Sequence, residues 1–233
     1  MNDAYSDSMR KKRISDSDQA VPNDEVQFRD FRHSDIEACA RISADAWPET
    51  ANVSGGDTVR TMTLYVEFYY HSATWLDVAC VNGQVVGLLF GRIDKELGRF
   101  GSIRSRLGHC KVYLELIMGR YWKVSDRFKL VKFALSDDRN ITENSPGADG
   151  EVMLFVVDGK FQGRGIGRAL MDRFLQRARK ADSKRITVST NDIGCNWGFY
   201  DNYGFKLQGS FRDSFTSFVR KEEIKNLIFS IDL

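Results

Sequence analysis

The sequence predicts an α/β fold in which one mixed β-sheet is flanked by helices. Strand-like and helix-like segments follow one another in the order βααββ, an insertion, and then βαβαββ. Asn82-Gly83 separates two strand-like runs, which is a strong signal for a β-hairpin. Val152–Val157 is a continuous apolar run that leads through a glycine-rich loop into an amphipathic helix. These observations favour a domain built around that strand.

The composition limits the classes of protein to which the chain can belong. Hydrophobic residues make up 42% of the 233 residues, which is enough for a packed core, and the net charge of +2 is too small for a nucleic-acid polyelectrolyte. No apolar run approaches the roughly 20 residues of a membrane span, and the N-terminus lacks a signal-peptide core. Four scattered cysteines and three histidines do not suggest a zinc cluster. We expect a cytoplasmic protein without a metal and without a membrane or nucleic-acid partner.

The first elements follow from hydrophobic periodicity and from helix-end signals. Ser34 and Glu37 have the spacing of a capping box, and Trp47-Pro48 ends the helix that they begin. Asp57 can cap the next helix, whose aromatic residues indicate either a core face or a pocket wall. The elements expected up to residue 93 are strands at 26–31, 76–81 and 84–93, helices at 34–46 and 59–70, and a polar loop at 51–57.

Two segments are expected to lie outside this regular pattern. Residues 1–23 are polar and charged, so we expect a mobile tail, followed by a single domain at 24–233. An insertion at about 94–148 is predicted to be helical, with helices near 113–122 and 128–135. Between residues 94 and 135 ten Lys and Arg stand against four Asp and Glu, which gives 10 − 4 = +6. This charge either attracts an acidic ligand or forms the outer face of a helical hairpin, and both readings stay open.

The second half is predicted to continue the sheet. A helix follows the glycine-rich loop, and Gly204 is well placed to end a later, shorter helix. The remaining elements are expected as strands at 185–190, 205–211 and 215–220 and a short helix at 194–202, while residues 222–233 remain unassigned between helix and strand.

The glycine-rich loop Gln162-Gly-Arg-Gly-Ile-Gly167 is a candidate anion site. A glycine loop that opens a helix lets backbone N–H groups approach an anion without Cβ atoms in the way. Arg164 and Arg168 lie in the first turns of that helix, where cations oppose the helix dipole unless an anion binds there. The loop lacks the Lys-Ser/Thr of a P-loop, and its glycine spacing does not fit the dinucleotide fingerprint.

Two motifs together resemble the GNAT superfamily of acetyl-CoA-dependent N-acetyltransferases. Gln162-Gly-Arg-Gly-Ile-Gly167 matches the family signature [Q/R]-x-x-G-x-[G/A] after a central strand. Phe199-Tyr200 followed by Gly204-Phe205 matches a second family signature in the same order along the chain. The resemblance covers about residues 24–220. It implies a GNAT-type mixed central sheet, with the helical insertion between the third and fourth strands.

The resemblance implies that acetyl-CoA is the cosubstrate and that a primary amine accepts its acetyl group. The pyrophosphate would bind the loop amides, the pantetheine arm would pair with the strand like an added strand, and the Val157 N–H would polarise the thioester carbonyl. Asn191 and Asn196 are further candidates near the cleft. The implied cofactor-binding residues are Phe155, Val156, Val157, Gln162, Gly163, Arg164, Gly165, Ile166, Gly167, Arg168, Asn191 and Asn196.

The resemblance also assigns catalytic roles. Glu151, eleven residues before the motif Gln, would be the general base that removes a proton from the amine. Tyr200 would be the general acid that protonates the departing thiolate. Transfer would occur by direct attack in a ternary complex. An acyl-enzyme on Cys195 is disfavoured, because no histidine lies near it in the sequence.

The acceptor side is the least defined part of the prediction. In the fold of the family that the chain resembles, the first two helices form the acceptor side. Trp47, Tyr65 and Tyr69 are therefore candidates for the wall of the acceptor site, and the insertion is a candidate lid. Neither the amine nor the acyl chain is identified, and a homodimer is left open. Two alternatives remain: a catalytically silent module that binds acyl-CoA, and a protein that binds a partner through the basic insertion.

Overall fold

The computed structural model describes residues 25–54, 57–118, 132–133, 135–136, 139–141, 143–145, 147–193 and 197–233. Its described part holds a seven-stranded sheet in the order β1-β2-β3-β4-β5-β7-β6. Every neighbouring pair is antiparallel except β4 and β5. The strands are β1 (Val26–Asp30), β2 (Trp75–Val81), β3 (Gln84–Ile93), β4 (Gly150–Val157), β5 (Arg185–Asn191), β6 (Lys206–Arg212) and β7 (Lys225–Asp232).

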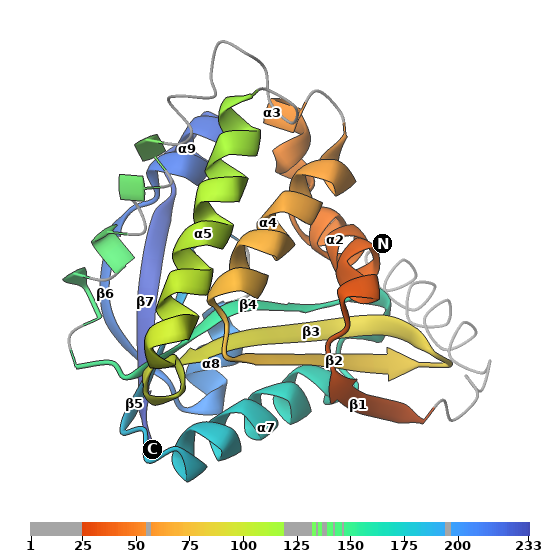
Figure 1. The fold of residues 1–233 in the computed structure, drawn as a ribbon, viewed down its shortest axis with the longest axis vertical. Coiled ribbons are helices and arrows are strands. Elements are labelled where there is room, and N and C mark those ends of the chain that lie inside the picture. Colours follow the sequence, from red (N-terminus) through yellow and green to blue (C-terminus); the bar gives the residue numbers. More distant parts are fainter. Residues whose placement is uncertain are drawn as a thin grey trace, which may run out of the picture.

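Helices cover both faces of the sheet, as predicted (Figure 1). One face packs against α7 in a core that includes Leu170 and Phe174. The other face packs against α2 and α4, and α5 lies on α4. No helix of the described segments is long and apolar enough to cross a bilayer. The helices are α2 (Ile36–Ala46), α3 (Ala51–Ser54), α4 (Thr58–Ser72), α5 (Gly98–Ile117), α7 (Ile166–Lys180), α8 (Trp197–Tyr203) and α9 (Ser214–Arg220).

The hairpin of β2 and β3 has the predicted turn. Asn82 and Gly83 both have positive φ, 50° and 78°, which suits the right-handed twist of the two strands. Gly91 of β3 shows why the strand carries glycines, because a Cβ there would lie 2.3 Å from the Phe174 ring of α7. The glycine therefore lets a core aromatic pack against the strand backbone.

The capping box predicted at Ser34 and Glu37 is wrong. A 3-10 helix, η1 (His33–Asp35), precedes α2, and Asp35 accepts from the Arg32 N–H at 2.7 Å. Asp35 also pairs with Arg29 of β1 at 2.7 Å. Glu37 instead pairs with Arg41 one turn later. The longer-range pair with Arg29 favours Asp35 over the local Ser34 cap.

The segment predicted as a polar loop at 51–57 is partly helical. The 3-10 helix η2 (Pro48–Thr50) runs into α3, and only residues 55–56 of this stretch lie outside the described residues. Asp57 accepts from the Arg60 N–H at 2.9 Å and so caps α4 as predicted. Trp47 ends α2, also as predicted.

The described part of the insertion is mostly helical, which confirms its predicted class. Its helix α5, preceded by η3 (Asp94–Glu96), begins earlier than the predicted 113. Gly108 allows α5 to approach α4 closely, since a Cβ would lie 2.2 Å from the His71 side chain. Phe68 of α4 stacks on His109 of α5 with ring centroids 4.0 Å apart. The predicted helix at 128–135 and the tail at 1–23 lie wholly or mostly outside the described residues.

The end of the chain corrects the predicted order of strands. The strand expected at 215–220 is the helix α9, because Asp213 caps it by accepting from the Thr216 N–H at 2.7 Å. The last strand, β7, comes from the unassigned end and inserts between β5 and β6. Gly204, at φ 112°, ends α8 as expected.

Candidate functional site

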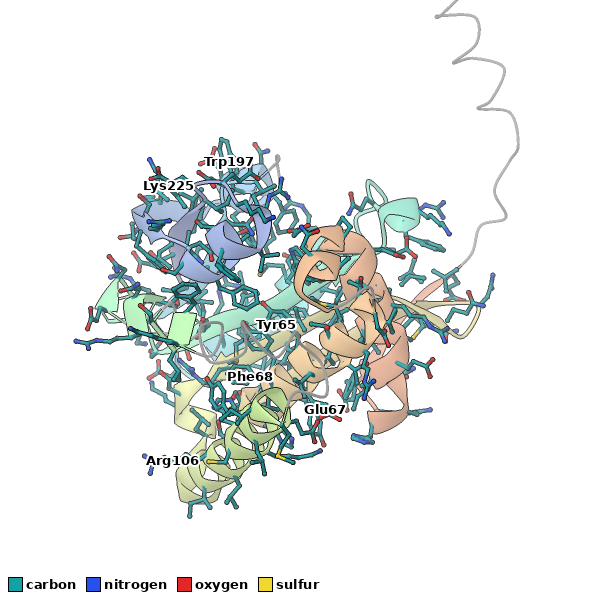
Figure 2. All side chains as sticks on the ribbon, turned by 90° about the horizontal axis from the view of Figure 1, so that it is seen from above. Tyr65, Glu67, Phe68, Arg106, Trp197 and Lys225 are labelled. Atoms are coloured by element: carbon teal, nitrogen blue, oxygen red, sulfur yellow. The ribbon has the colours of Figure 1, made fainter. Side chains whose placement is uncertain are left out.

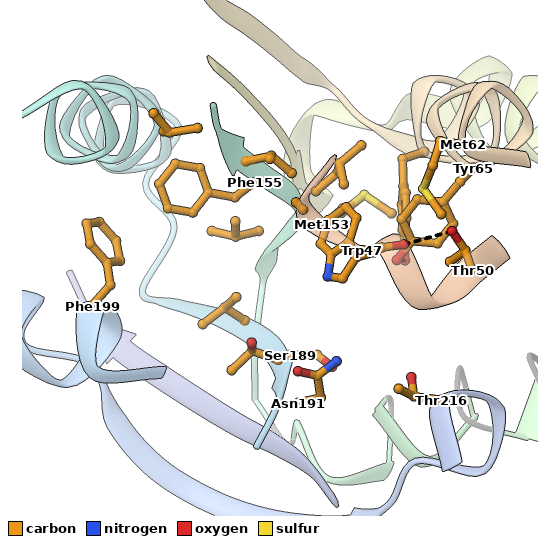
Figure 3. A pocket seen from close by; sticks show the side chains of 18 of the residues that line it. Trp47, Thr50, Met62, Tyr65, Met153, Phe155, Ser189, Asn191, Phe199 and Thr216 are labelled. Carbon is orange, nitrogen blue, oxygen red and sulfur yellow. Dashed lines mark hydrogen bonds between the residues drawn. The ribbon is translucent and has the colours of Figure 1, made fainter. Parts of the chain in front are cut away.

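The parallel strands β4 and β5 pair along only part of their length. Their register covers Gly150 to Val152 of β4 and Ile186 to Val188 of β5. Beyond Val152 the two strands are no longer paired, whereas β4 stays paired with β3 as far as Val157. One edge of β4 is therefore open toward β5 over residues 153–157, and the two strands frame a gap in the centre of the sheet (Figure 3).

A bulge in β4 separates its two ends. Phe90 is paired with Leu154 and Gly91 with Val152, so Met153 is the extra residue. Val152 packs into the core on the α7 side and Leu154 into the core on the α2 and α4 side. Glu151 is adjacent to Val152, so strand alternation directs it to the α2 and α4 side.

Glu151 is paired with an arginine of the neighbouring strand. Its Oε2 lies 3.4 Å from Arg92 Nη2, and Arg92 is opposite Glu151 in the β3–β4 register. The carboxylate side chain is 17% exposed, and Glu151 lines the pocket described below. The predicted base therefore lies at the gap with a positive charge beside it.

Backbone groups of β4 offer the gap a hydrogen-bonding edge. The Asp158 N–H donates to the Val86 carbonyl at 2.9 Å, so its neighbour Val157 directs its own N–H and C=O away from β3. Gln162 Nε2 donates to that Val157 carbonyl at 3.0 Å. By the same alternation, the backbone N–H and C=O of Phe155 point toward the gap, whereas those of Val156 point toward β3. Of the three residues predicted to bind the donor arm, Phe155 and Val157 therefore direct backbone groups toward the gap.

The glycine-rich loop leads from β4 into α7 and leaves helix amides uncovered. Gly163 and Gly165 have φ of 76° and 80°, and a Cβ at either would meet nothing within 4 Å. Gly165 is the N-cap of α7 and no side chain caps the helix, so its first amides lack an acceptor within the helix. A Cβ at Gly167 would lie 3.2 Å from the Phe155 ring, which is a tight contact. The loop is an open cradle of N–H groups.

The turn before the loop is built by Asp158 and leads through η4 (Gly159–Phe161). The Asp158 carboxylate accepts from the Lys160 N–H at 2.9 Å, and the Asp158 carbonyl accepts from the Phe161 N–H at 2.8 Å. Arg164 lies over the Phe161 ring at 4.9 Å, and Arg168 lies over the Tyr203 ring at 5.1 Å. Both arginines are exposed, so an anion at the helix start would meet cationic side chains.

One pocket of about 720 Å³ brings the predicted residues together (Figure 3). Phe155 and Phe199 lie on one side of it, Trp47 and Tyr65 lie on the other, and Asn191 lies at the β5 side. Arg164 does not line the pocket, and Asn196 and Cys195 lie outside the described residues. The predicted residues that line it are Trp47, Tyr65, Tyr69, Glu151, Phe155, Val156, Val157, Gln162, Gly163, Gly165, Ile166, Gly167, Arg168, Asn191 and Tyr200.

Tyr200 lines the same pocket from α8. Its side chain is buried among aromatic rings, with Phe199 at 5.5 Å and Phe205 at 5.8 Å between ring centroids. Burial raises the pKa of the Tyr200 hydroxyl above its usual value. The phenol therefore keeps its proton at neutral pH, as a proton donor must.

The three aromatic residues predicted for the acceptor side lie next to one another and line the pocket. Trp47 and Tyr65 have ring centroids 5.9 Å apart, Tyr65 and Tyr69 4.8 Å, and the two tyrosine hydroxyls are 3.3 Å apart. Figure 2 shows Tyr65 near the middle of the molecule, between Arg106 of α5 and Trp197 of α8. From the insertion, Val112, Tyr113 and Ile141 also line the pocket. The insertion therefore contributes to the pocket wall.

Several pocket residues were missed by sequence reasoning. Asp213 and Thr216 come from α9 and its cap, Asn226 comes from β7, and Ser189 donates to Asn226 Oδ1 at 2.6 Å. Glu49 comes from η2. Asp192, next to Asn191, does not line the pocket, and its carboxylate accepts from the Lys225 N–H at 3.0 Å. The signal for Asp213 was its spacing before Thr216, a cap pattern.

Comparison with known proteins identifies the fold. Residues 134–214, which contain both motifs, match the family model described as acetyltransferase (GNAT) domain. Ard1 from Thermoplasma volcanium is 18% identical, with a TM-score of 0.52 over 89% of this chain and 97% of that one. Ribosomal-protein-alanine N-acetyltransferase from Brucella melitensis is 16% identical, with a TM-score of 0.52 over 89% and 99%. N-acetyltransferase from Staphylococcus aureus Mu50 is 14% identical, with a TM-score of 0.51 over 89% and 98%. No curated protein matches the chain.

Proposed function

We propose that this chain, which belongs to the GNAT superfamily, transfers an acetyl group from acetyl-CoA to a primary amine. One observation carries the proposal. A single pocket joins the open edge of β4, the glycine cradle at the start of α7, a buried tyrosine and an aromatic wall. That combination provides a place for an extended acyl donor and a separate place for an acceptor beside it.

The residues at the donor end fit coenzyme A. Uncovered amides at the start of α7 and the nearby Arg168 suit a pyrophosphate, since the helix dipole and a cation both favour an anion. The backbone groups of Phe155 and Val157 suit an extended amide-containing arm that pairs as a strand would. When bound, acetyl-CoA supplies the activated thioester. The Val157 N–H is the donor we assign to the thioester carbonyl oxygen.

Glu151 and Tyr200 carry the proton transfers in this proposal. An alkylammonium, with a pKa near 10.4, must lose a proton before it can attack. Glu151 takes this proton, directly or through water, and passes it to solvent. The amine nitrogen then forms the N–C bond as the C–S bond breaks. Tyr200 gives its proton to the leaving sulfur and regains one from the nitrogen, so the net products are the amide, the free thiol and one proton.

A thiol-release assay tests this function against the silent acyl-CoA module. Purified protein is mixed with acetyl-CoA and a panel of amines that includes polyamines, aminoglycosides, amino acids, aminosugars and lysine peptides. We expect release of free CoA that depends on at least one amine and is lost in Tyr200→Phe. Tight acetyl-CoA binding by calorimetry without CoA release from any amine would contradict the enzyme and support the silent module.

A further inference from the structure

Helix α5 is apolar on two opposite faces. Its inner face packs on α4, where a Cβ at Gly108 would lie 2.2 Å from the His71 side chain and where Val112 is buried. Its outer face is exposed at the rim of the molecule, where Figure 2 shows Arg106. We call this outer face the outer stripe. Its residues are Ile103, Leu107, Cys110, Leu114, Ile117 and Met118.

The outer stripe follows one side of α5 over about four turns. From Ile103 to Ile117 its residues are spaced alternately by four and three positions. At about 3.6 residues per turn, this spacing keeps the side chains within an arc of about 100°. The Met118 N–H donates to the Leu114 carbonyl at 2.8 Å, so Met118 extends the same face beyond the end of α5. Two helices with this spacing pack along a common seam.

The outer stripe is large enough for a specific contact. Its isoleucine, leucine and methionine side chains are between 37% and 69% exposed. With roughly 100 Å² exposed on each of them, one stripe presents about 500 Å² of apolar surface. A contiguous apolar patch of this size is commonly a contact surface. Two such stripes packed together would bury about 1,000 Å², which is the area at which specific interfaces begin.

The outer stripe is complementary to itself. Ile103 and Ile117 each lie seven residues from Cys110, and Leu107 and Leu114 lie three and four residues from it. An antiparallel second α5, with a two-fold axis at Cys110, would set Ile103 level with the partner's Ile117. The rise of about 1.5 Å per residue would also bring Leu107 within about 1.5 Å of the level of the partner's Leu114. An interface between two identical chains requires this kind of self-complementarity.

The charges that border the outer stripe are compatible with a second copy. Arg106 is exposed on one border. On the other border Lys111 Nζ lies 3.6 Å from Glu67 Oε2 and 3.9 Å from Glu115 Oε1. Among the charged side chains that the structure describes at these borders, two cations thus stand with two carboxylates. A second copy therefore meets no excess of like charge there, whereas an anionic membrane would favour a uniformly basic border.

We propose that a second copy of this chain binds the outer stripe, with the two α5 helices antiparallel and the two Cys110 side chains close to the two-fold axis. The proposal goes beyond the proposed function and does not depend on acetyl transfer. The contact would lie behind the pocket, because the same helix supplies Val112 and Tyr113 to the pocket wall. The insertion thus has two roles, one in the pocket and one in assembly.

Sedimentation velocity of the full chain, in reducing buffer, tests the assembly. We expect a dimer to dominate at about 50 μM. Leu107→Glu combined with Leu114→Glu should raise the dissociation constant by more than about 100-fold, because the seam would bury carboxylates without partners. Leu207→Glu is the control, since Leu207 is an exposed leucine of β6 outside the stripe. A monomeric wild type, or a double variant that keeps its helix content by circular dichroism and still dimerises, would overturn the proposal.

Crosslinking tests the position of the two-fold axis without a change to the stripe leucines. A short bismaleimide alkylates one thiol at each end, so it joins two chains only where their thiols lie close together. In a Cys195→Ser background we expect a covalent dimer that is lost in Cys110→Ser, because Cys39 and Cys80 are buried. A dimer that does not crosslink through Cys110 would overturn the proposed geometry. A chain that stays monomeric and co-sediments with phosphatidylserine-containing vesicles would overturn the proposal in favour of a membrane surface.

Discussion

The two ends of the pocket are built from the chain in different ways. The donor end comes mainly from one continuous stretch, in which β4 runs through the glycine cradle into α7. The acceptor end is assembled from η2, α4, α5, β5 and α9, which are far apart in the sequence. Local sequence therefore fixes the geometry of the first, whereas only the tertiary fold creates the second. A motif can reveal the donor end, and no motif reveals the acceptor end.

The chemistry of the two ends differs in the same way. The donor end offers N–H groups and Arg168, which suit an anion. The acceptor end offers a wall of aromatic rings from Trp47, Tyr65 and Tyr69, which suits an apolar or cationic group. This division predicts that a change at one end alters the binding of one substrate and leaves the binding of the other largely unaffected.

The largest expected effect is at the glycine cradle. Gly165→Glu adds a side chain to a residue whose φ is 80°, which is a strained conformation for any residue but glycine. It also puts a carboxylate where we expect the pyrophosphate. Acetyl-CoA affinity should fall by more than about 1,000-fold, or ~4 kcal/mol, measured by calorimetry. Gly83→Glu is the matched control, because Gly83 also has a positive φ and open space but lies in the hairpin turn. Unchanged affinity in Gly165→Glu would remove the cradle from the donor site.

The next effect concerns the proton donor between the two ends. Tyr200→Phe should lower kcat by about 100-fold or more, the scale of general acid catalysis, with little change in acetyl-CoA affinity. Tyr203→Phe on the same helix provides the control, since the Tyr203 hydroxyl bonds Asp172 and the residue does not line the pocket. Steady-state rates and calorimetry on both variants give the comparison. A full rate in Tyr200→Phe would exclude it as the acid.

A smaller effect is expected at the aromatic wall. Tyr65→Leu removes the ring between Trp47 and Tyr69 and should raise the KM for the amine by about 10-fold, or ~1.4 kcal/mol. Acetyl-CoA affinity should stay unchanged. Tyr70→Leu on the same helix is the control, because Tyr70 does not line the pocket. If the two variants have the same KM, Tyr65 is a packing residue and not part of the acceptor end.

The smallest expected effect is one of pH. Burial raises the folded-state pKa of Tyr200, so the acid stays protonated as pH rises toward the ordinary tyrosine value of about 10. The kcat at saturating substrates should therefore show no loss from Tyr200 between about pH 7 and pH 10. A pH–rate profile checks this. A fall in kcat centred below about pH 9 that disappears in Tyr200→Phe would contradict the assignment.

The sequence predicted local features of the fold well. Asn82-Gly83, Asp57 and Gly204 act at short range, through positive φ or a cap three residues away, so the residues themselves specify the outcome. The Ser34 cap failed because Asp35 has a partner, Arg29, in another element. The alternation in residues 215–220 also failed, because the Asp213 cap and the packing of α9 across the pocket override strand propensity.

The residues of the site divide in the same way, into those that a local motif predicts and those that only long-range contacts bring together. Gln162 to Gly167 and Tyr200 lie in motifs and could be named in advance. The bulge at Met153, which directs Glu151 toward the α2 and α4 side, depends on the register with β3 and leaves no clear signal in the sequence. Glu49 and Asp213 share a pocket only because α9 crosses to η2, a contact between residues more than 160 positions apart. Long-range contacts of this kind set the acceptor end.

Hydrogen exchange in the presence of CoA tests most directly whether the open edge of β4 and the glycine cradle form the donor site. Backbone amides are compared with and without saturating CoA, at single-residue resolution. We expect slowed exchange at Phe155, Val157 and residues 163–168, and little change at Glu49, Tyr65 and Asp213. Saturable binding of CoA that leaves the amides of Val157 and residues 163–168 unprotected would contradict this account.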